Sequence, residues 1–362
     1  MSKLELSDEL KLAIGRIKTD VDRELAIFFD MKIAEAGKLD PQYKRLLQEM
    51  KKFALRGGKR LRPFMAWLGW QIAGGKNYDH FIQTVMAWEL YHNFAIIHDD
   101  IMDNDDTRYG GPNIKGAYER LFRRSHSAEV ADLHARNMAL LAGDIAVGLT
   151  IEVLQNAPYP PEIKDRLQRD MLKLHFSLAG GQMLDDLAVI TRDMNLAKIR
   201  KVYLYKTARY SMVAPMQSGA ILAGANDTIL NIIERYGVHA GIAYQITDDL
   251  LGMYGTAKEI GKPTITDLRE KKKTILMYYG LQFANAADKA VLLAKWGNPR
   301  VASSDLKLVR KILNDNGAKA KTIFLAQAEA VAAKKAIGKL AMPGELPKLF
   351  EDFTDYLVSR SA

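Results

Sequence analysis

The sequence predicts an all-α protein, and three observations carry that prediction. Apolar residues recur at helical spacing through nearly all of the 362 residues. No run of alternating β-branched residues competes with that spacing, and no repeat of fixed period is present. Glycines and prolines break the pattern into segments of ordinary helix length. With 48% hydrophobic residues the chain can bury a substantial core in one large domain or two, and we expect one, over residues 1–362.

Composition limits the possible classes of protein. The chain has no cysteine, which excludes disulfides and thiolate metal sites. Its first residues, MSKLELSDELKL, have the pattern of an amphipathic helix and not of a signal peptide. No stretch of about 18 apolar residues is found, so we expect no membrane span and a cytoplasmic protein. The net charge of +9 favours acidic partners, which could be nucleic acid, anionic lipid or phosphorylated small molecules.

The chain opens with two expected helices, one over Ser7–Ala36 and one that begins after Pro41 and runs to about Leu55. The next segment, Arg56–Pro63, reads RGGKRLRP, in which two glycines end one helix and a proline suits the first turn of another. Its basic residues, Lys59 and Arg62 among them, stand beside the free N–H groups of that helix start. This combination binds phosphate or diphosphate well, although an ordinary basic loop has the same composition.

An apolar helix that includes Glu89 ends in five aspartates between positions 99 and 106. Asp99 and Asp103 are one turn apart on a single face, and Asp100 stands at its edge. Apolar residues at helical spacing occupy another side, which can pack in a core. Two carboxylates about 5 Å apart repel by roughly 3 kcal/mol at an effective dielectric constant near 20. Such oxygen ligands suit a hard cation, Mg²⁺ before Ca²⁺ or Mn²⁺, although a solvated acidic helix end looks the same in sequence.

The segment Tyr109–Pro112 predicts a turn, and the stretch from there to about Ser127 predicts a loop or broken helix. A loop directly beyond a metal site can close over a ligand. Helical spacing then predicts helices over Val130–Leu154, Glu162–Leu187 and Leu196–Ala223, with three prolines between the first and the second.

Two of these helices carry polar residues that attract interest. Gln182, Asp185 and Asp186 lie on one face of the second helix, and Lys206 and Thr207 lie within the third. A solvated face explains the first group equally well, and a lysine in the middle of a helix is usually at the surface. Neither group predicts a function by itself.

The helix expected over Asn231–Met253 presents a second acidic face. Gln245, Asp248 and Asp249 share that face, and Gly252 falls on it one turn later. An adjoining apolar side can hold the helix in the core. One acidic face is common, but two on otherwise apolar helices, with separate basic clusters, suggest several divalent ions that hold a polyanion between them.

A loop over Tyr254–Leu268 follows this helix and leads to three lysines, Lys271–Lys273, which form a basic cluster near the second acidic face. A solvated helix start would explain the same run of charge. The remainder, to Ala362, has the pattern of Ala- and Lys-rich amphipathic helices with a break at Met342–Gly344. No motif in that remainder predicts chemistry.

Five ordered motifs resemble those of the trans-isoprenyl diphosphate synthases, also called polyprenyl synthetases. The resemblance covers roughly Phe53 to Thr274 and is most similar to the short-chain members. It implies an all-α bundle around a central active-site cavity, usually in a homodimer, and small-molecule substrates. The motifs read GGKRLRP at 57–63, DDIMD at 99–103, GQMLD at 181–185, KT at 206–207 and YQITDD at 244–249.

The resemblance also implies residues that bind metal, residues that bind substrate and residues that take part in catalysis. The ligands it implies for about three Mg²⁺ ions are Asp99, Asp100, Asp103, Asp248 and Asp249. The substrate-binding residues it implies are Lys59, Arg62, His92, Arg108, Gln182, Lys206, Lys262 and Lys272, of which the first three would contact isopentenyl diphosphate (IPP). The catalytic residues it implies are the same five metal ligands (Asp99, Asp100, Asp103, Asp248 and Asp249) together with Arg108, Lys206, Thr207 and Gln245.

The implied reaction is head-to-tail prenyl transfer from an allylic diphosphate (DMAPP, GPP or FPP) to IPP. Arg108, Lys206 and Lys262 would join the metal ions in stabilising charge on the departing diphosphate. Thr207 and Gln245 would offer oxygens near the allylic cation, in a cavity that excludes water. No histidine or glutamate stands out as a general base, so the departing diphosphate would take the proton.

Product length would depend on residues below the first aspartates, namely Tyr91, Phe94 and Ala95. Ala95 lies one turn below Asp99 and leaves space. Phe94 matches the family position at which an aromatic residue limits growth. The first motif also lacks the two-residue insertion common in bacterial farnesyl diphosphate synthases. We therefore predict geranylgeranyl diphosphate (C20), with farnesyl diphosphate (C15) as the alternative.

Two positions depart from the family pattern. Tyr109 stands where a second arginine is usual, which removes a charge-assisted contact to IPP, and Gly252 replaces a third aspartate. These departures support an alternative of another class, a non-catalytic subunit that binds a prenyl diphosphate or modifies a partner synthase. A nucleic-acid binder would need basic residues on one face with aromatic stacking, whereas the basic residues here alternate with acidic motifs.

Overall fold

The computed structural model describes residues 6–191, 193–256 and 265–359 and confirms the predicted all-α fold. The first elements are α1 (Asp8–Leu39), α2 (Pro41–Leu55), α3 (Leu61–Ile72), α4 (Tyr78–Val85), α5 (Ala87–Met102), β1 (Thr107–Arg108), β2 (Gly111–Pro112), α6 (Ile114–Phe122), α7 (Ala128–Gln155) and α8 (Pro161–Ile190). The later ones are α9 (Leu196–Val202), η1 (Tyr203–Val213), α10 (Ala214–Leu222), α11 (Asp227–Tyr254), α13 (Thr266–Arg269), α14 (Ile275–Phe283), α15 (Ala286–Lys295), α16 (Ser303–Asp315), α17 (Ala318–Ile337) and α18 (Leu346–Ser359).

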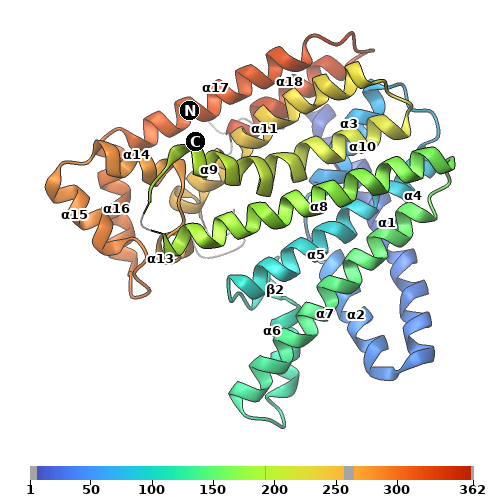
Figure 1. Ribbon diagram of the computed structural model, residues 1–362, viewed down its shortest axis with the longest axis horizontal. Helices are drawn as coiled ribbons and strands as arrows, with labels where there is room; N and C mark the ends of the chain where they lie inside the picture. Colours follow the sequence, from blue (N-terminus) through green and yellow to red (C-terminus); the bar gives the residue numbers. More distant parts are fainter. Residues whose placement is uncertain (1–5, 192, 257–264, 360–362) are drawn as a thin grey trace.

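The long helices lie side by side, and α13–α16 form a smaller group at one end of the molecule (Figure 1). α7 packs on α5, α3 packs on α10, and α17 packs on α11. Two clusters of buried apolar side chains hold these helices together, one centred on α1–α8 and α10, the other on α9 and α13–α17. α11 contributes to both clusters. Its acidic face is therefore fixed by apolar packing along its whole length.

The helix predicted over Leu196–Ala223 is divided in three, because its middle, η1, is a π-helix. A π-helix of this length is unusual and is typical of functional sites. η1 lies very close to α11, since a Cβ added at Gly241 would overlap Ala208. This close approach brings Lys206 and Thr207 of η1 toward the acidic face of α11.

The region after the first aspartates differs from the prediction in two ways. β1 and β2 form a two-residue antiparallel hairpin, in a chain for which no strand was expected. Its turn residues, Tyr109 and Gly110, have φ of 54° and 74°, and positive φ at both is the requirement of a type I′ turn. The following segment, expected as loop or broken helix, forms α6, because the Asn113 side chain caps its first turn by accepting from Gly116 N–H.

α7 is long and apolar enough, by length and composition alone, to span a membrane, although Asp144 and Glu152 interrupt its apolar run. It packs against α5 and α6, and 44% of its most apolar window is buried. Core helices of globular proteins commonly have this composition. Five large apolar side chains of α7 are exposed: Val130, Leu133, Leu140, Leu141 and Ile151.

Candidate active site

One cavity of about 910 Å³ brings together residues from both acidic helix faces and from the basic segment before α3. Its lining comes from α3, α5, η1 and α11, from the hairpin, and from the segment that follows α13. The predicted site residues that line it are Lys59, Arg62, His92, Asp99, Arg108, Lys206, Thr207, Gln245, Asp248, Asp249 and Lys272.

Asp99, near the end of α5, forms an ion pair with Lys206, whose Nζ lies 3.2 Å from its carboxylate. The same ammonium group lies 2.7 Å from Asp185 of α8, the last residue of the GQMLD motif. Burial works to raise the pKa of Asp99, but Lys206, Lys272 and other cations outweigh it and lower that pKa. Asp99 is therefore an anion within reach of several cations.

Asp100 lies behind this face and is buried. Arg108 donates to one of its oxygens, through Nε at 2.9 Å and through a terminal nitrogen, and Asn113 donates to the other at 3.0 Å. Burial raises the pKa of Asp100 to about 6, although Arg108 and Asn113 oppose the rise. Arg108 belongs to the hairpin and Asn113 caps α6, so Asp100 links both to α5. This contact holds Arg108 at the cavity wall.

Asp103 is the C-terminal cap of α5 and is partly buried. It faces Lys272, because its charge helps to raise the Lys272 pKa. Burial opposes that rise, and Asp267 contributes more to it than Asp103 does. Lys272 thus interacts with aspartates of α5 and with Asp267 of α13.

On α11, the prediction that Gln245, Asp248, Asp249 and Gly252 share a face is confirmed, since all four line the cavity. Gln245 accepts from Thr207 at 2.5 Å and donates to Asp249 at 2.8 Å. The buried hydroxyl of Tyr203 donates to the other oxygen of Asp249.

Burial raises the pKa of Asp249 to about 8 in spite of these two donors. Asp248, one residue earlier, is more accessible and faces the open part of the cavity. Of this pair, Asp248 is the better placed to bind a cation, whereas Asp249 is buried against Tyr203 and Gln245.

Gly252 makes room for another carboxylate. A Cβ at this position would overlap the side chain of Asp267, which comes from the short helix α13 and also lines the cavity. Asp267 lies 3.9 Å from Lys272 and adds to the negative charge around Asp249. The space of a side chain at position 252 is therefore filled by Asp267, a residue that the helical pattern of α11 could not identify.

Lys59, Arg60 and Arg62, in the basic segment at the start of α3, all line the cavity, but Arg60 has a structural role. Arg60 is 4% exposed and donates to Asp22, Glu89 and the Ala54 carbonyl, so it holds α1, α2 and α5 together. Lys59 is exposed, and its Nζ lies 2.7 Å from the Tyr356 hydroxyl. This segment therefore supplies cations at the cavity while a buried ion pair fixes its backbone.

Arg62 and His92 complete this end of the cavity. The guanidinium group of Arg62 lies 4.0 Å above the Tyr210 ring and donates to Ser211. His92 makes a 2.8 Å hydrogen bond with the Tyr210 hydroxyl. Tyr109 also lines this end, and its ring packs against Gly57. A phenol thus occupies the place where the family pattern predicts a second arginine.

Other predicted residues lie away from the cavity lining. Gln182 contacts the Met102 sulfur at 3.4 Å and does not line the cavity, and Lys262 lies outside the described residues. Asp186 is exposed, so the face predicted for Gln182, Asp185 and Asp186 is only partly directed inward.

Two of the predicted chain-length residues, Tyr91 and Phe94, form an aromatic layer with His175. Phe94 lies 5.4 Å from Tyr91 and 5.2 Å from His175 of α8, measured between ring centroids. The Tyr91 hydroxyl lies 3.2 Å from His175 Nδ1. This layer joins α5 to α8, and His175 is a member that no sequence pattern indicated.

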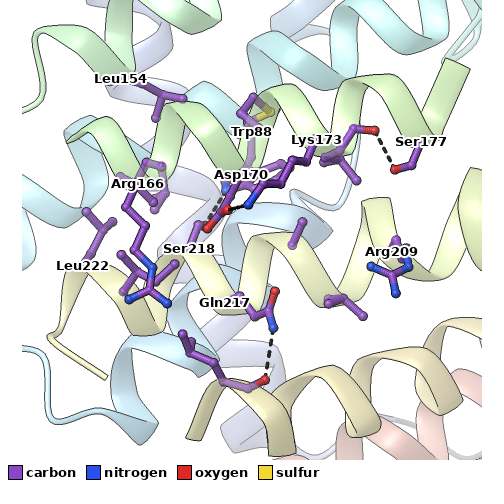
Figure 2. A pocket seen from close by; sticks show the side chains of 18 of the residues that line it. Trp88, Leu154, Arg166, Asp170, Lys173, Ser177, Arg209, Gln217, Ser218 and Leu222 are labelled. Carbon is purple, nitrogen blue, oxygen red and sulfur yellow. Dashed lines mark hydrogen bonds and ion pairs between the residues drawn. The ribbon is translucent and has the colours of Figure 1, made fainter. Parts of the chain in front are cut away.

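A second cavity, of about 650 Å³, lies between α8, α10 and the start of α11. Trp88 borders it and donates to Ser218 at 2.8 Å (Figure 2). Arg166, Lys173 and Arg209 lie around it (Figure 2) and pair with nearby acids, so it has no large excess of charge.

The donor set of the first cavity fits Mg²⁺. Within residues 6–191, 193–256 and 265–359 no three acidic or histidine side chains are gathered closely enough to enclose an ion. Mg²⁺ in proteins typically takes one or two carboxylates, with water and substrate phosphates as its other ligands. Asp99 and Asp248 of the lining, and Asp103 one turn beyond Asp99, are partly exposed oxygen donors of this kind. Lys206 and Lys272 partly neutralise the charge of Asp99.

Sequence reasoning missed the residues that support this site from other elements: Asp267, Tyr203, Tyr210, Asn113 and His175. Each acts across a tertiary contact, so no local periodicity marks it. Only the run of aromatic and polar residues in η1, YLYKTARYS, gave a signal, since such residues are unusual on the face of a buried helix.

Comparison with known proteins agrees with this geometry. Residues 44–313 match the family model described as polyprenyl synthetase. The chain is 29% identical to a (2E,6E)-farnesyl diphosphate synthase of Mycobacterium bovis, over 84% of the chain and 80% of that protein. It is 30% identical to a geranylgeranyl diphosphate synthase of Saccharolobus solfataricus, over 85% of each.

Similar structures support the same relationship. A geranylgeranyl pyrophosphate synthase from Corynebacterium glutamicum, solved with isoprenyl diphosphate and magnesium, has a TM-score of 0.90 to this chain at 25% identity. The match covers 95% of this chain and 99% of that one. The family model, the relatives and the shared architecture lead to one conclusion: the chain belongs to the polyprenyl synthetase family, whose curated relatives are trans-prenyltransferases.

Proposed function

We propose that this chain condenses IPP head-to-tail with allylic diphosphates and that geranylgeranyl diphosphate (C20) is its main product. The observation that carries the proposal is that Asp99 of α5 and the Asp248–Asp249 pair of α11 line one cavity together with Lys206 and Lys272. A second group of cations, Lys59 and Arg62, lines the other end. This distribution of charge favours two diphosphates, one at each end.

In this proposal Asp99 and Asp248, which line the cavity, hold Mg²⁺ with Asp103, which lies one turn beyond Asp99 at the end of α5 and outside the lining. Asp249 supports them, and Asp267 is a further carboxylate nearby. About three bound Mg²⁺ ions would neutralise charge on the allylic diphosphate. Asp100 acts mainly through Arg108, which it orients by accepting two of its N–H groups at one oxygen.

The protein's own cations then stabilise the leaving group. Lys206 now pairs with Asp99 and Asp185, and we expect it to donate to the allylic diphosphate when that substrate binds, together with Arg108 and Lys262. Thr207 and Gln245, which are hydrogen-bonded to each other, present oxygens to the developing allylic cation. The π-helix brings these groups together on one wall of the cavity.

Chain length is the finer part of the proposal. Curated relatives include farnesyl, geranylgeranyl and geranylfarnesyl diphosphate synthases, so family membership leaves the length open. The aromatic layer of Tyr91, Phe94 and His175 supports a short product, since it packs large rings at α5 about one to two turns before Asp99. Ala95 leaves room beside it. We favour C20, with C15 as the alternative.

We further infer a cytoplasmic homodimer. α7 and α8 expose apolar side chains that a second copy of this chain would cover, among them Leu133, Leu140, Leu172 and Phe176. Sedimentation equilibrium should then give a mass near twice the 40.6 kDa of one chain. A monomer at micromolar concentration would contradict this part of the proposal.

The test of function is a Mg²⁺-dependent assay with IPP and each of three primers, DMAPP, GPP and FPP, with products read by mass. A C20 product is expected. A farnesyl product would keep the enzyme and change the chain length. If no primer is elongated by folded protein that still binds diphosphates, the non-catalytic subunit becomes the leading interpretation, since Tyr109 and Gly252 depart from the family pattern.

A further inference from the structure

Tyr210 connects two cavity residues that are far apart in the sequence. Its hydroxyl lies 2.8 Å from His92 Nδ1, and its ring lies 4.0 Å from the guanidinium carbon of Arg62. Tyr210 is 5% exposed and does not line the cavity, whereas Arg62 and His92 do. A side chain in this position can affect a ligand through the residues in front of it.

The surroundings determine which nitrogen of His92 carries a proton. Burial, and then the charges of Arg62 and Arg108, lowers the pKa of His92 well below its usual value, so the ring is neutral. Burial raises the pKa of Tyr210, so its phenol keeps the O–H. His92 is the one hydrogen-bond partner of that hydroxyl in the described part of the chain. Tyr210 therefore donates to Nδ1, and the proton of the imidazole is on Nε2.

Arg62 is held from two sides. One terminal nitrogen donates to Ser211 at 2.8 Å, and the guanidinium plane rests on the Tyr210 ring as a cation–π contact. Its buried Nε has no hydrogen-bond partner among the described residues. An arginine fixed in this way offers preorganised donors to an anion in the cavity.

We propose that Tyr210 is a positioning residue of the IPP subsite. Its ring sets the plane of Arg62, and its hydroxyl holds His92 in the Nε2–H tautomer, so that both side chains donate to one diphosphate. The inference rests on the proposed function, which makes IPP the occupant of this end. Because Tyr109 stands where another cation is usual, the orientation of the remaining donors matters more for binding.

Two substitutions separate the two contacts of Tyr210. Tyr210→Phe removes only the hydroxyl, and the KM for IPP should rise about 3- to 10-fold, the value of one hydrogen bond. Tyr210→Leu also removes the ring, and the rise should reach about 10- to 100-fold. The KM for the allylic primer and kcat should stay within about twofold, which a general loss of structure would not produce. Tyr205→Phe, on the same π-helix but beside the second cavity, is the matched control.

A double substitution tests whether the effect passes through His92. In a His92→Ala background, Tyr210→Phe should cause no further rise in the KM for IPP, because no imidazole is left to hold. Additive effects of the two substitutions would overturn that half of the proposal.

The tautomer can be measured without catalysis. Long-range ¹H–¹⁵N spectra of the seven imidazoles, with His92 assigned by His92→Gln, should show Nδ1 without a proton in the wild type and a mixture in Tyr210→Phe. An Nδ1–H signal in the wild type, or a Tyr210→Phe variant that matches the Tyr205→Phe control in both experiments, would overturn the proposal. If the wild type elongates no primer, the proposed function fails, while the spectra still test the role of Tyr210.

Discussion

Gly252→Ala is the substitution for which the structure predicts the most specific effect. Gly252 is buried on the acidic face of α11, and a Cβ there would overlap a carboxylate oxygen of Asp267. Asp267 is adjacent to the buried Leu268, so α13 cannot easily move away. The Asp267 side chain must therefore rotate, which separates it from Lys272 and changes the charge around Asp248 and Asp249.

The added carbon meets the far end of the flexible Asp267 side chain, so rotation relieves the overlap and the cost lies at the lower end of overpacking, about 1 kcal/mol. If this loss falls on the transition state, kcat/KM decreases roughly 5-fold. The assay is IPP incorporation as a function of Mg²⁺ concentration, and the half-saturating concentration should also rise. Gly15→Ala, on an open face of α1 with nothing near the added carbon, is the matched control.

A charge swap refines the test. Gly252→Asp alone should be at least as harmful as Gly252→Ala, because it adds a like charge to the same overlap. Combined with Asp267→Gly, it moves the carboxylate to α11 and should recover part of the activity. If Gly252→Ala keeps wild-type kcat/KM and Mg²⁺ dependence, the inference that Asp267 fills this space in the working enzyme is wrong.

Three further predictions follow from other parts of the site. Phe94→Ala should lengthen the product, because it opens the aromatic layer; an unchanged product distribution by mass would contradict this. Tyr109→Arg should lower the KM for IPP about tenfold by restoring a charged donor. An unchanged KM would show that the Tyr109 hydroxyl already supplies this contact to the diphosphate. Asp249, with its pKa raised to about 8 from 3.8, stabilises the fold fully below pH 3.8 and loses that contribution as pH rises toward 8. In metal-free protein Asp249→Asn should therefore flatten the fall of Tm between about pH 5 and 8, measured by circular dichroism, whereas Asp186→Asn should not.

Helical periodicity predicted most of the fold, because apolar spacing and turn residues are local signals. It predicted the shared face of Gln245, Asp248 and Asp249, which line the cavity together. It failed between Pro112 and Ser127, where α6 depends on the Asn113 cap and on packing against α7. It also missed the π-helix, since residues at α-helical and π-helical spacing differ too little over one turn to be distinguished in sequence.

The roles of individual site residues were harder to predict than their location. Asp99 and Asp100 are neighbours in one motif, yet one faces the cavity and the other is buried against Arg108. A basic run supplied both the structural Arg60 and the cavity residue Arg62. These differences depend on which partners other helices and the hairpin bring close, and that information is tertiary.

The central claim is that two acidic faces, on α5 and α11, act on one substrate across the cavity. The most direct test is kcat for IPP incorporation at saturating Mg²⁺ in Asp99→Asn and Asp248→Asn, with the exposed Asp186→Asn as control. Loss of one such electrostatic group from a preorganised site typically costs about 10²- to 10³-fold, and we predict that loss for each of the two variants but not for the control. Wild-type kcat in either Asp99→Asn or Asp248→Asn would contradict the claim.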